Sequence, residues 1–297
     1  MRDQDGNATS GAIVVKNSHT EITGCIIENN QGDFSQTIAG ICGIVGREGS
    51  NLNINNNVIR DNSWDGIALY RKAIAKISNN LIYNGRGAGI GITWDSRARV
   101  RFNVIHHYWK GIGTFGKSWA TLNNNLVRDV RGWGIIASGE SSMSCNNNEV
   151  RRCGNAGFAV WDSTASMDIF NNVICQNGTE KQWVAPLVGI WLASEVSKVD
   201  IIGNLFWDND EADIGVGYKE PGLGDAAFTF AYKTERFNNT KFRPTPPTVN
   251  QGNYFTTRPD TSSDISKGVI NPKPGIMWIP PYESNWTWDP DKEPFED

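Results

Sequence analysis

The sequence of 297 residues lacks the features of membrane proteins, nucleic-acid-binding proteins and disulfide-rich domains. No apolar run approaches the length of a membrane span, and the polar start Met1–Gly6 is not a secretory leader. A formal net charge of −4 without a dominant basic stripe argues against a nucleic-acid partner. The five cysteines are an odd number, so at least one thiol is free, and we expect neither a disulfide framework nor a metal site.

Helical periodicity is also absent, and a regular repeat takes its place. Glycines that open an apolar segment fall at intervals of 23, 23, 22, 23, 23 and 32 residues: Gly43, Gly66, Gly89, Gly111, Gly134, Gly157 and Gly189. A column of asparagines keeps step with them: Asn57, Asn80, Asn103, Asn125, Asn148, Asn172 and Asn204. Two columns that stay in step over so many repeats indicate a solenoid.

Each repeat contains three short apolar segments. In the first, Leu52 and Ile54 alternate with a polar residue, as in a strand with one buried face. The second follows the asparagine, and the third follows the glycine as Ile67 and Leu69. Strands this short need neighbours stacked about 4.8 Å above and below them. We therefore predict an all-β, single-stranded parallel β-helix of about eight rungs, with three short strands per rung.

The asparagine column is predicted to form the corner between the first and second strands. Asparagine tolerates a left-handed φ, and stacked amides can hydrogen-bond to one another and to the backbone. Glu149 departs from the pattern, because the equivalent residues in other repeats include Val58 and Leu81. We place this position outward or at a rim, since an unpaired buried glutamate is costly.

The repeats define the predicted domain organisation. Residues 1–217 are predicted to form the β-helix, including an early turn in which Ile22 matches Ile54 at an offset of 32. The exposed strand edges of that turn would need a missing N-terminal cap or a partner chain, for instance in a homo-oligomer. Eleven of the twelve prolines lie beyond residue 218. We predict a C-terminal rung and an extended capping tail over 218–297, within the same domain.

Rungs of this kind resemble the right-handed parallel β-helix proteins of the pectin-lyase-like superfamily, over roughly residues 11–217. That superfamily includes polysaccharide lyases, glycoside hydrolases, sugar epimerases and phage tailspikes. The resemblance implies a polysaccharide lying along one strand face across several rungs. It does not determine the chemistry. The polygalacturonase set of paired aspartates with Gly-His-Gly and Arg-Ile-Lys is missing, as are the Arg-x-Pro-x-x-Arg run of pectate lyases and the Tyr-Gly-Phe-Asp-Pro-His type motif of alginate epimerases.

The third strand offers the surface best suited to a sugar polymer. Its outward positions are predicted to form a smooth floor of small residues: Gly66, Gly89, Gly111, Gly134, Gly157, Ala68, Gly91, Gly113 and Ala159. Aromatic and charged residues at both edges suit sugar rings and hydroxyls, and Asp65 and Lys110 stand on one of these edges. The substrate-binding candidates are Tyr70, Arg71, Trp94, Trp109, Phe115, Arg128, Arg131, Trp133 and Trp161.

Three carboxylates beside the third strand are candidates for hydrolysis of a glycosidic bond. Asp95 and Glu140 lie two rungs apart, about 10 Å at the backbone, which with side-chain reach suits an inverting hydrolase. Glu140 and Asp162 lie one rung apart, about 5 Å, which suits a retaining one. Lys117 would hold a neighbouring carboxylate ionised. The same residues equally fit solvated turns of alternating charge.

Two other functions stay open. A lyase would need a base such as His106, His107 or Lys117, with Arg128 and Arg131 to neutralise a uronate. A non-catalytic glycan-binding shaft, like an adhesin or a tailspike, needs none of these groups. We slightly favour a hydrolase that acts on a polysaccharide in a surface groove, without a cofactor.

Asp208, Asp210 and Asp213 offer oxygen ligands for Ca²⁺, but their spacing matches no loop motif. An extracellular or cell-surface location fits this function, and a cytoplasmic one also fits the sequence.

Overall fold

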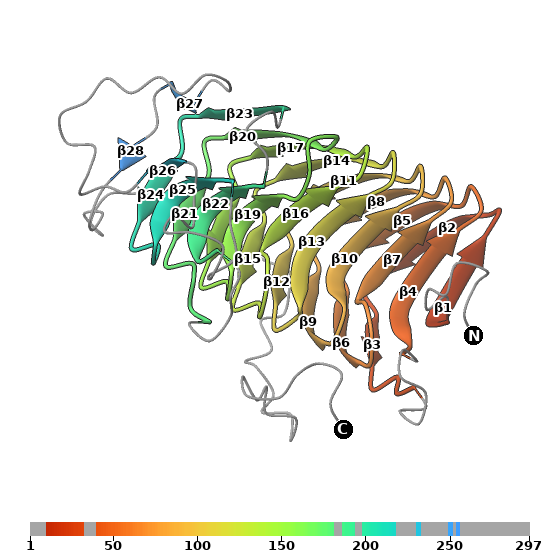
Figure 1. Cartoon of the computed structure of the whole chain (residues 1–297). Helices are drawn as coiled ribbons and strands as arrows, with labels where there is room; N and C mark the ends of the chain where they lie inside the picture. The colour runs from red at the N-terminus through yellow and green to blue at the C-terminus, as the bar shows by residue number, and fades with distance from the viewer. Residues whose placement is uncertain are drawn as a thin grey trace.

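The predicted all-β solenoid is confirmed by a computed structural model of the chain. The structure describes residues 10–32, 40–180, 186–193 and 198–217, and the backbone of 230–232, 249–251 and 254–255. Every helix or strand assigned within these ranges is a β-strand. Successive turns of chain stack along one axis, so that strands far apart in sequence lie side by side (Figure 1).

The three strands of each turn form three long sheets. Sheet 1 contains β2 (His19–Thr23), β5 (Asn51–Asn55), β8 (Ile74–Ser78), β11 (Arg97–Arg101), β14 (Trp119–Asn123), β17 (Ser142–Asn146), β20 (Ser166–Phe170), β23 (Lys198–Ile202) and β27 (Val249–Gln251). Sheet 2 contains β3 (Ile26–Glu28), β6 (Val58–Asn62), β9 (Leu81–Gly85), β12 (Val104–His106), β15 (Leu126–Arg128), β18 (Glu149–Arg151), β21 (Val173–Cys175), β24 (Leu205–Trp207) and β28 (Tyr254–Phe255).

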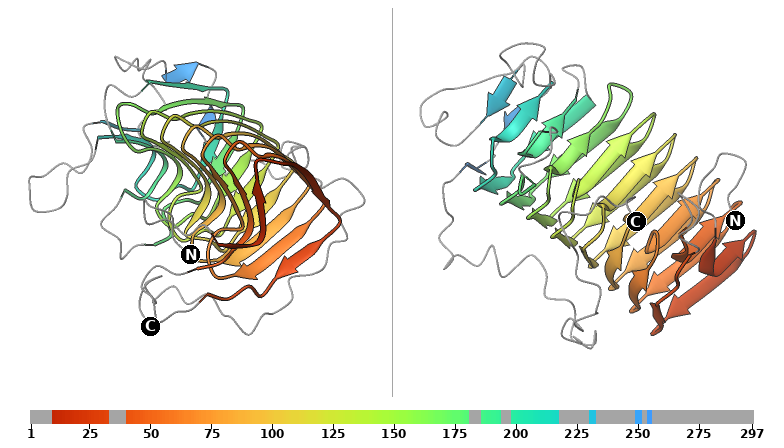
Figure 2. Two further views of the ribbon diagram at one scale, coloured as in Figure 1. Left: turned by 90° about the vertical axis from the view of Figure 1, so that its right-hand side faces the viewer. Right: turned by 60° about the horizontal axis from the view of Figure 1, so that its bottom comes forward.

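Sheet 3 contains β1 (Gly11–Lys16), β4 (Cys42–Arg47), β7 (Ile67–Tyr70), β10 (Ala88–Thr93), β13 (Lys110–Phe115), β16 (Ile135–Ser138), β19 (Ala156–Val160), β22 (Val188–Leu192), β25 (Ala212–Val216) and β26 (Phe230–Tyr232). Neighbouring strands are parallel, except that β26 pairs with β25 in the antiparallel direction. The two views of Figure 2 show the coil along and across its axis.

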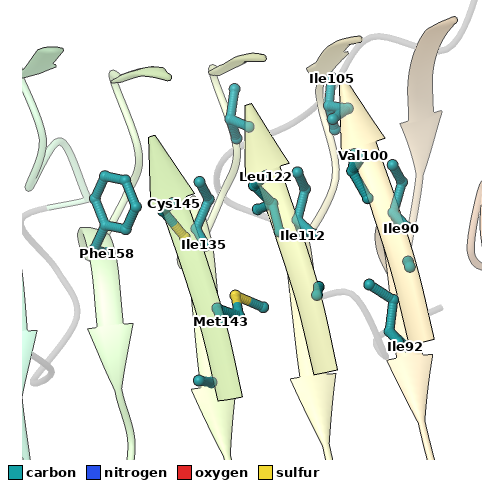
Figure 3. Packing of buried hydrophobic residues seen from close by; sticks show 14 of the residues in the cluster. Ile90, Ile92, Val100, Ile105, Ile112, Leu122, Ile135, Met143, Cys145 and Phe158 are labelled. Carbon is teal, nitrogen blue, oxygen red and sulfur yellow. The ribbon is translucent and has the colours of Figure 1, made fainter. Parts of the chain in front are cut away.

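The core consists of columns of equivalent apolar residues. Val100 on β11 pairs in register with Ile77 below it and Leu122 above it, and all three are fully buried. The inward residues of sheet 3 face these columns, with Ile90, Ile112, Ile135 and Phe158 in successive turns (Figure 3). Since each residue packs on its own counterpart in the next turn, the sequence repeat appears in space as a layered core.

The asparagine column forms a continuous ladder at the corner between sheets 1 and 2, which we call the first corner. The backbone N and the Nδ2 of Asn80 both donate to Oδ1 of Asn103, at 3.0 and 2.9 Å, and Asn103 makes the same pair of bonds to Asn125. Equivalent bonds run from Asn57 to Asn204. The predicted left-handed φ belongs to the preceding residue instead, such as Asn79 with a φ of 55°.

The corner between sheets 2 and 3, the second corner, has an interrupted ladder. Asparagines form stacked pairs at its two ends: Asn30 with Asn62, and Asn177 with Asn209. In the four turns between them the position is held by Gly85, Tyr108, Val130 and Cys153. The Tyr108 side chain is buried there, and its hydroxyl has no hydrogen-bond partner among the described residues.

The predicted floor of glycines is wrong for the column that opens the third strand. A Cβ built on Gly111 would lie 2.4 Å from the Val127 side chain, which belongs to the core, and 2.4 Å from the carbonyl oxygen of Gly134. Gly66, Gly89, Gly134 and Gly157 meet equivalent obstacles. These glycines allow the second corner to close tightly on the core, and they do not form an outer surface. The outward small residues are Ala68, Gly91, Gly113 and Ala159.

The early turn of the solenoid has the predicted register. Ile22 pairs with Ile54, and Ile27 pairs with Ile59. At the other end, β27 and β28 add one strand each to sheets 1 and 2, as a further turn of the solenoid requires. Most of the predicted capping tail over 218–297 lies outside the described residues.

The cysteines and Glu149 can be placed individually in the structure. All five cysteines are free thiols. Glu149 is half-buried on the outer side of sheet 2, where its Oε1 lies 3.1 Å from Nε of Arg151. Among the described residues, no helix is long and apolar enough to span a membrane.

Candidate functional site

The outer side of sheet 3 carries a short stretch without side chains, bounded by aromatic residues. Gly91 on β10 and Gly113 on β13 are adjacent in register and point away from the core. A Cβ on Gly113 would be in ordinary van der Waals contact with the Ile136 side chain at 3.4 Å, so this position would accept a small side chain without a clash. We call this stretch the glycine surface. Figure 1 shows β10 and β13, the two strands that carry it, side by side near the middle of the solenoid.

An aromatic group borders the glycine surface toward the N-terminal turns. The rings of Tyr70 and Trp94 are tilted against each other with centroids 5.6 Å apart. The Arg71 guanidinium lies 5.6 Å from the centroid of the Trp94 ring. Tyr70 is buried against Val45 and Ala68 on the outer side of the sheet, so its ring is held in place by packing. Aromatic faces of this kind are suited to the apolar faces of sugar rings.

A series of four tryptophans borders the glycine surface toward the C-terminal turns. Trp109 meets Trp133 edge to face at 5.8 Å, Trp133 meets Trp161 at 4.9 Å, and Trp161 meets Trp191 at 5.1 Å. Trp161 is exposed, whereas Trp133 is held between its neighbours and Ile136. We call this series the tryptophan cluster. The aromatic residues that the sequence predicted on two opposite edges therefore meet across the strands of sheet 3.

Asp65 is a buried carboxylate beside the glycine surface. Its Oδ1 accepts a hydrogen bond from the Ala88 backbone N at 2.6 Å. Its Oδ2 lies 3.2 Å from the place where Gly91 would carry a Cβ, and a Cβ on Gly87 would lie 2.0 Å from Oδ1. Burial raises the pKa of Asp65 to about 6, although the Ala88 hydrogen bond and the Lys110 charge act in the opposite direction. Two glycines thus make room for one carboxylate, whose pKa lies closer to neutral pH than that of an ordinary aspartate.

Lys110 is the cation associated with Asp65. Both side chains occupy the same column on the outer side of sheet 3, two turns apart, which is about 10 Å at the backbone. Burial lowers the pKa of Lys110, whereas the Asp65 charge raises it. Its Nζ lies 5.9 Å from the centroid of the Trp133 ring, so Lys110 stands between the carboxylate and the tryptophan cluster. Perturbed acid and base groups on one surface are a feature of catalytic sites.

The carboxylates predicted for hydrolysis lie at the corner between sheets 3 and 1, the third corner. Asp95, Lys117 and Glu140 follow one another in successive turns there, as predicted from the repeat. Glu140 lies 3.7 Å from Nζ of Lys117, and both side chains are about two-thirds exposed, at 66% and 65%. Asp95 is exposed as well. An exposed ion pair of this kind contributes little to stability.

Asp162 has a turn-stabilising role in the structure. Its Oδ1 accepts hydrogen bonds from the backbone N and the hydroxyl of Thr164 at 2.9 and 2.6 Å, and its Oδ2 accepts one from the Gly139 backbone N at 2.6 Å. Burial alone would raise its pKa, but these hydrogen bonds lower it below its ordinary value. Both oxygens are therefore occupied, and the group is a poor proton donor.

His107 and Arg128 lie on sheet 2 and the turn that follows it, apart from the other candidates. Nδ1 of His107 lies 2.5 Å from Nδ1 of His106, whose ring stacks on Tyr83 with centroids 4.9 Å apart. Burial lowers the pKa of both histidines. Arg128 pairs with Asp129, which Arg152 also binds at 2.5 Å. Burial would raise the pKa of Asp129, but its hydrogen bonds with Arg152 and Arg128 lower it to about 2.

The remaining candidates are divided between the glycine surface and its margins. Phe115 follows Gly113 on β13 and is exposed beside the glycine surface. Arg131 is buried, with its guanidinium 5.8 Å from the centroid of the Trp109 ring. Asp213, named for Ca²⁺ with Asp208 and Asp210, accepts a hydrogen bond from Nδ2 of Asn209 at 2.8 Å. In the described part of the chain, no three His, Cys, Asp or Glu side chains are grouped in a way that could hold a metal ion.

Sequence reasoning places Asp65 on an edge of the third strand but gives it no chemical role. The sequence does mark Asp65 as unusual. The equivalent position in other turns is held by Cys42, Ala88, Trp133 and Ala156, so Asp65 is the carboxylate among them. Two glycines of the next turn, Gly87 and Gly91, lie next to the Asp65 carboxylate and leave room for it. Burial, however, which changes the chemistry of the group, is visible only in three dimensions.

Comparisons with known proteins agree with this architecture. A family model described as "Right handed beta helix region" matches residues 42–206, which is more than half of the chain. The chain belongs to the right-handed β-helix family. A search of curated proteins gave no match. This β-helix protein is similar to a solved structure described as pectate lyase Pel9A, with 12% identity and a TM-score of 0.40. That likeness covers 75% of this chain and 63% of the other, and it concerns the fold alone.

Proposed function

We propose that this β-helix protein binds a polysaccharide across the glycine surface and cleaves it there. The observation that carries the proposal is the position of Asp65, a buried carboxylate with a pKa of about 6, beside two glycines of sheet 3 that lie between aromatic groups. Aromatic residues with a few convergent polar groups are typical of carbohydrate sites. The absence of a side chain on Gly113 would let a sugar approach the sheet closely.

The groups around Asp65 favour β-elimination over hydrolysis. Hydrolysis by either stereochemical course needs two carboxylates within roughly 5–9.5 Å of each other. The charge that acts on Asp65 is instead that of a lysine, Lys110. Elimination requires one base and one cation, so the pair Asp65 and Lys110 is sufficient. The carboxylates of the third corner, Asp95 and Glu140, remain the candidates for a hydrolase.

The proposed elimination assigns one step to each group. The Asp65 carboxylate removes the proton on the carbon next to a uronate carboxylate, and the Lys110 ammonium stabilises the negative charge that develops. The electron pair of the broken C–H bond forms a C=C bond, and the glycosidic C–O bond breaks at the adjacent carbon. The leaving oxygen takes up a proton from water or from Lys110. A pKa of about 6 makes Asp65 a stronger base than an ordinary carboxylate while it stays ionised at neutral pH.

The test is an activity assay of the full chain on acidic and neutral polysaccharides, with new reducing ends and the absorbance of the unsaturated uronate as two readouts. We expect both signals on an acidic polymer, and a loss of at least about 100-fold in Asp65→Asn. Lys110→Met should lower kcat strongly as well. Asp95→Asn serves as the matched control on the third corner and should keep its activity.

Three results would contradict the proposal. Full activity in Asp65→Asn would remove the base from the mechanism. Reducing ends without an unsaturated product, together with loss of activity in Glu140→Gln, would instead support hydrolysis at the third corner. Binding of a polysaccharide by the wild type without any cleavage would identify a glycan-binding shaft. An extracellular or cell-surface location would fit each polysaccharide-directed function.

A further inference from the structure

The outer side of sheet 1 carries a line of positive charge that the proposed cleavage site does not use. Arg97, Arg99 and Arg101 alternate along β11 with the buried Ala98 and Val100. All three arginines are therefore on the outer side, about 6.6 Å apart from one to the next. Lys76 on β8 is the register partner of Arg99 and is exposed too. In Figure 1 this strand lies near the middle of the row of sheet 1 strands.

Within the part of the chain that the structure describes, none of these four cations forms an ion pair. The ion pairs of the described residues involve other arginines and lysines: Arg47, Arg60, Arg71, Lys117, Arg128, Arg151 and Arg152. The register partners of Arg101 are the uncharged Ser78 and Asn123. Like charges this close repel one another, so the arrangement has a cost in free energy unless an anion binds there.

Exposed apolar side chains lie next to the line of charge. Ile74 and Trp119 are the two register partners of Arg97, below and above it. Their exposed fractions are 49% and 39%, which is high for large apolar residues on a sheet. A tryptophan face beside an arginine is suited to a ligand that combines a ring with an anionic group.

The distribution of charge on sheet 1 favours a narrow ligand over a broad one. Beyond β14 the sheet is uncharged on β17, carries the outward carboxylate Asp168 on β20, and carries Asp200 together with Lys198 on β23. Burial and the Asp200 charge raise the pKa of Asp168. These carboxylates lie about 14 Å or more from β11, close enough to repel a wide anionic surface such as a membrane. The net charge of −4 acts in the same direction against duplex nucleic acid.

We propose that the outer side of sheet 1 around β11 is a second binding site, specific for an anionic polysaccharide. The chain of sugars would run along β11, with its carboxylate or sulfate groups on Arg97, Arg99 and Arg101 and one ring on Trp119. Arginine suits this role because its planar guanidinium can bind such groups with two parallel hydrogen bonds. This site lies on a different sheet from the glycine surface, and it does not depend on cleavage there.

The test is a binding titration of the full chain with polygalacturonate, heparin and dextran, which separates carboxylated, sulfated and neutral polymers. We expect binding of at least one anionic polymer and none of dextran. The double variant Arg97→Gln/Arg99→Gln should raise the Kd about tenfold or more. The matched double variant Lys16→Gln/Lys198→Gln removes the same charge from exposed positions away from β11, on sheet 3 and four strands further along sheet 1. It should change the Kd less than about twofold. Trp119→Ala should weaken binding by a factor that salt does not change.

Several results would contradict the proposed binding site on β11. An unchanged Kd in the double arginine variant would do so, as would equal losses in the matched lysine variant. Binding of duplex DNA or of anionic lipid vesicles, without binding of either anionic polysaccharide, would assign β11 to another partner. A dimer that the arginine variant dissociates, seen by light scattering, would show that a second copy of the chain covers this side. The double arginine substitution should raise the Kd by the same factor in an Asp65→Asn background, which separates this site from the cleavage site.

Discussion

Both the first and the second corner of the solenoid contain stacked asparagines, but only at the first corner is the ladder continuous. At the first corner every turn from Asn57 to Asn204 contributes an asparagine, and each amide bonds to the next. At the second corner the ladder is present at the ends, as in Asn177 and Asn209, and is replaced by other residues in four central turns. Asp65 follows the second corner one turn before these four, while Trp109, Lys110 and Trp133 follow it within them.

The difference indicates where the fold tolerates variation. A stacked amide at the first corner has partners on both sides, so that changing one residue leaves its neighbours with unsatisfied groups. The second corner is closed by glycines and by apolar packing, which require less of any single side chain. The residues that we propose for cleavage therefore lie next to the second corner, where the repeat can be broken without loss of the solenoid.

The largest expected effect comes from breaking the first corner. Asn103→Ala would leave the backbone N–H of Asn80 without its acceptor and remove the bonds from Nδ2 of Asn103 to Asn125 and to the Ile77 carbonyl. We expect a loss of about 2–4 kcal/mol in the free energy of unfolding, measured by urea denaturation. Asn53→Ala, which removes an exposed side-chain bond to Glu21, is the control and should cost less than about 0.5 kcal/mol. A loss below about 1 kcal/mol in Asn103→Ala would mean that the ladder is not essential.

The next effect concerns the pH dependence contributed by Asp65. Its pKa is about 6 in the folded chain and about 3.9 when unfolded, so the folded state binds the proton more tightly. Its contribution to stability is therefore lost as the pH rises from about 4 to about 6. Asp65→Asn should remove this loss and be more stable than the wild type at pH 7 by up to about 2–3 kcal/mol. Unfolding curves from pH 4 to pH 7 that stay parallel for the two proteins would contradict the burial of this carboxylate.

A smaller effect separates the two kinds of glycine on sheet 3. Gly111→Ala would bring a methyl group within 2.4 Å of the Val127 side chain and the Gly134 carbonyl, and we expect a cost of about 1–3 kcal/mol. Gly113→Ala meets atoms no closer than 3.4 Å, so it should change stability by less than about 0.5 kcal/mol. It should nevertheless weaken polysaccharide binding. Equal stability of the two variants in thermal unfolding would contradict the assignment of Gly111 to the corner.

The smallest effect is expected inside the second corner. The Tyr108 hydroxyl is buried without a hydrogen-bond partner among the described residues. Tyr108→Phe removes this unsatisfied group and keeps the ring, so it should raise the free energy of unfolding by about 1 kcal/mol. A decrease of the same size, measured by urea denaturation, would show that the hydroxyl has a partner such as a buried water.

Much of the fold could be predicted from the sequence, because a solenoid converts sequence intervals directly into neighbours in space. The spacing of Asn80 and Asn103 gave their contact, and the offset of Ile22 from Ile54 gave the register of the early turn. The orientation of Gly111 was predicted wrongly, since a glycine in sequence does not show whether the missing side chain would point inward or outward. Only its distances to Val127 and Gly134 decide this question.

The candidate site could be predicted only in part. The aromatic residues Tyr70, Trp94 and Trp133 were found from composition, and the structure shows their contacts. The chemistry of Asp65 depends on burial, and that of Asp162 depends on the hydrogen bonds that both its oxygens accept. Neither property follows from residue type and interval. His107 shows a further limit, because a position near the third strand in sequence lies in the turn after β12 of sheet 2, against His106.

The most direct test is a crystal structure of Asp65→Asn soaked with an oligosaccharide of the polymer that the wild type cleaves. We expect sugar rings over Gly91 and Gly113, between Trp94 and Trp133, with the glycosidic bond next to residue 65. Sugar bound at the third corner beside Asp95 and Glu140, with the glycine surface empty, would contradict it.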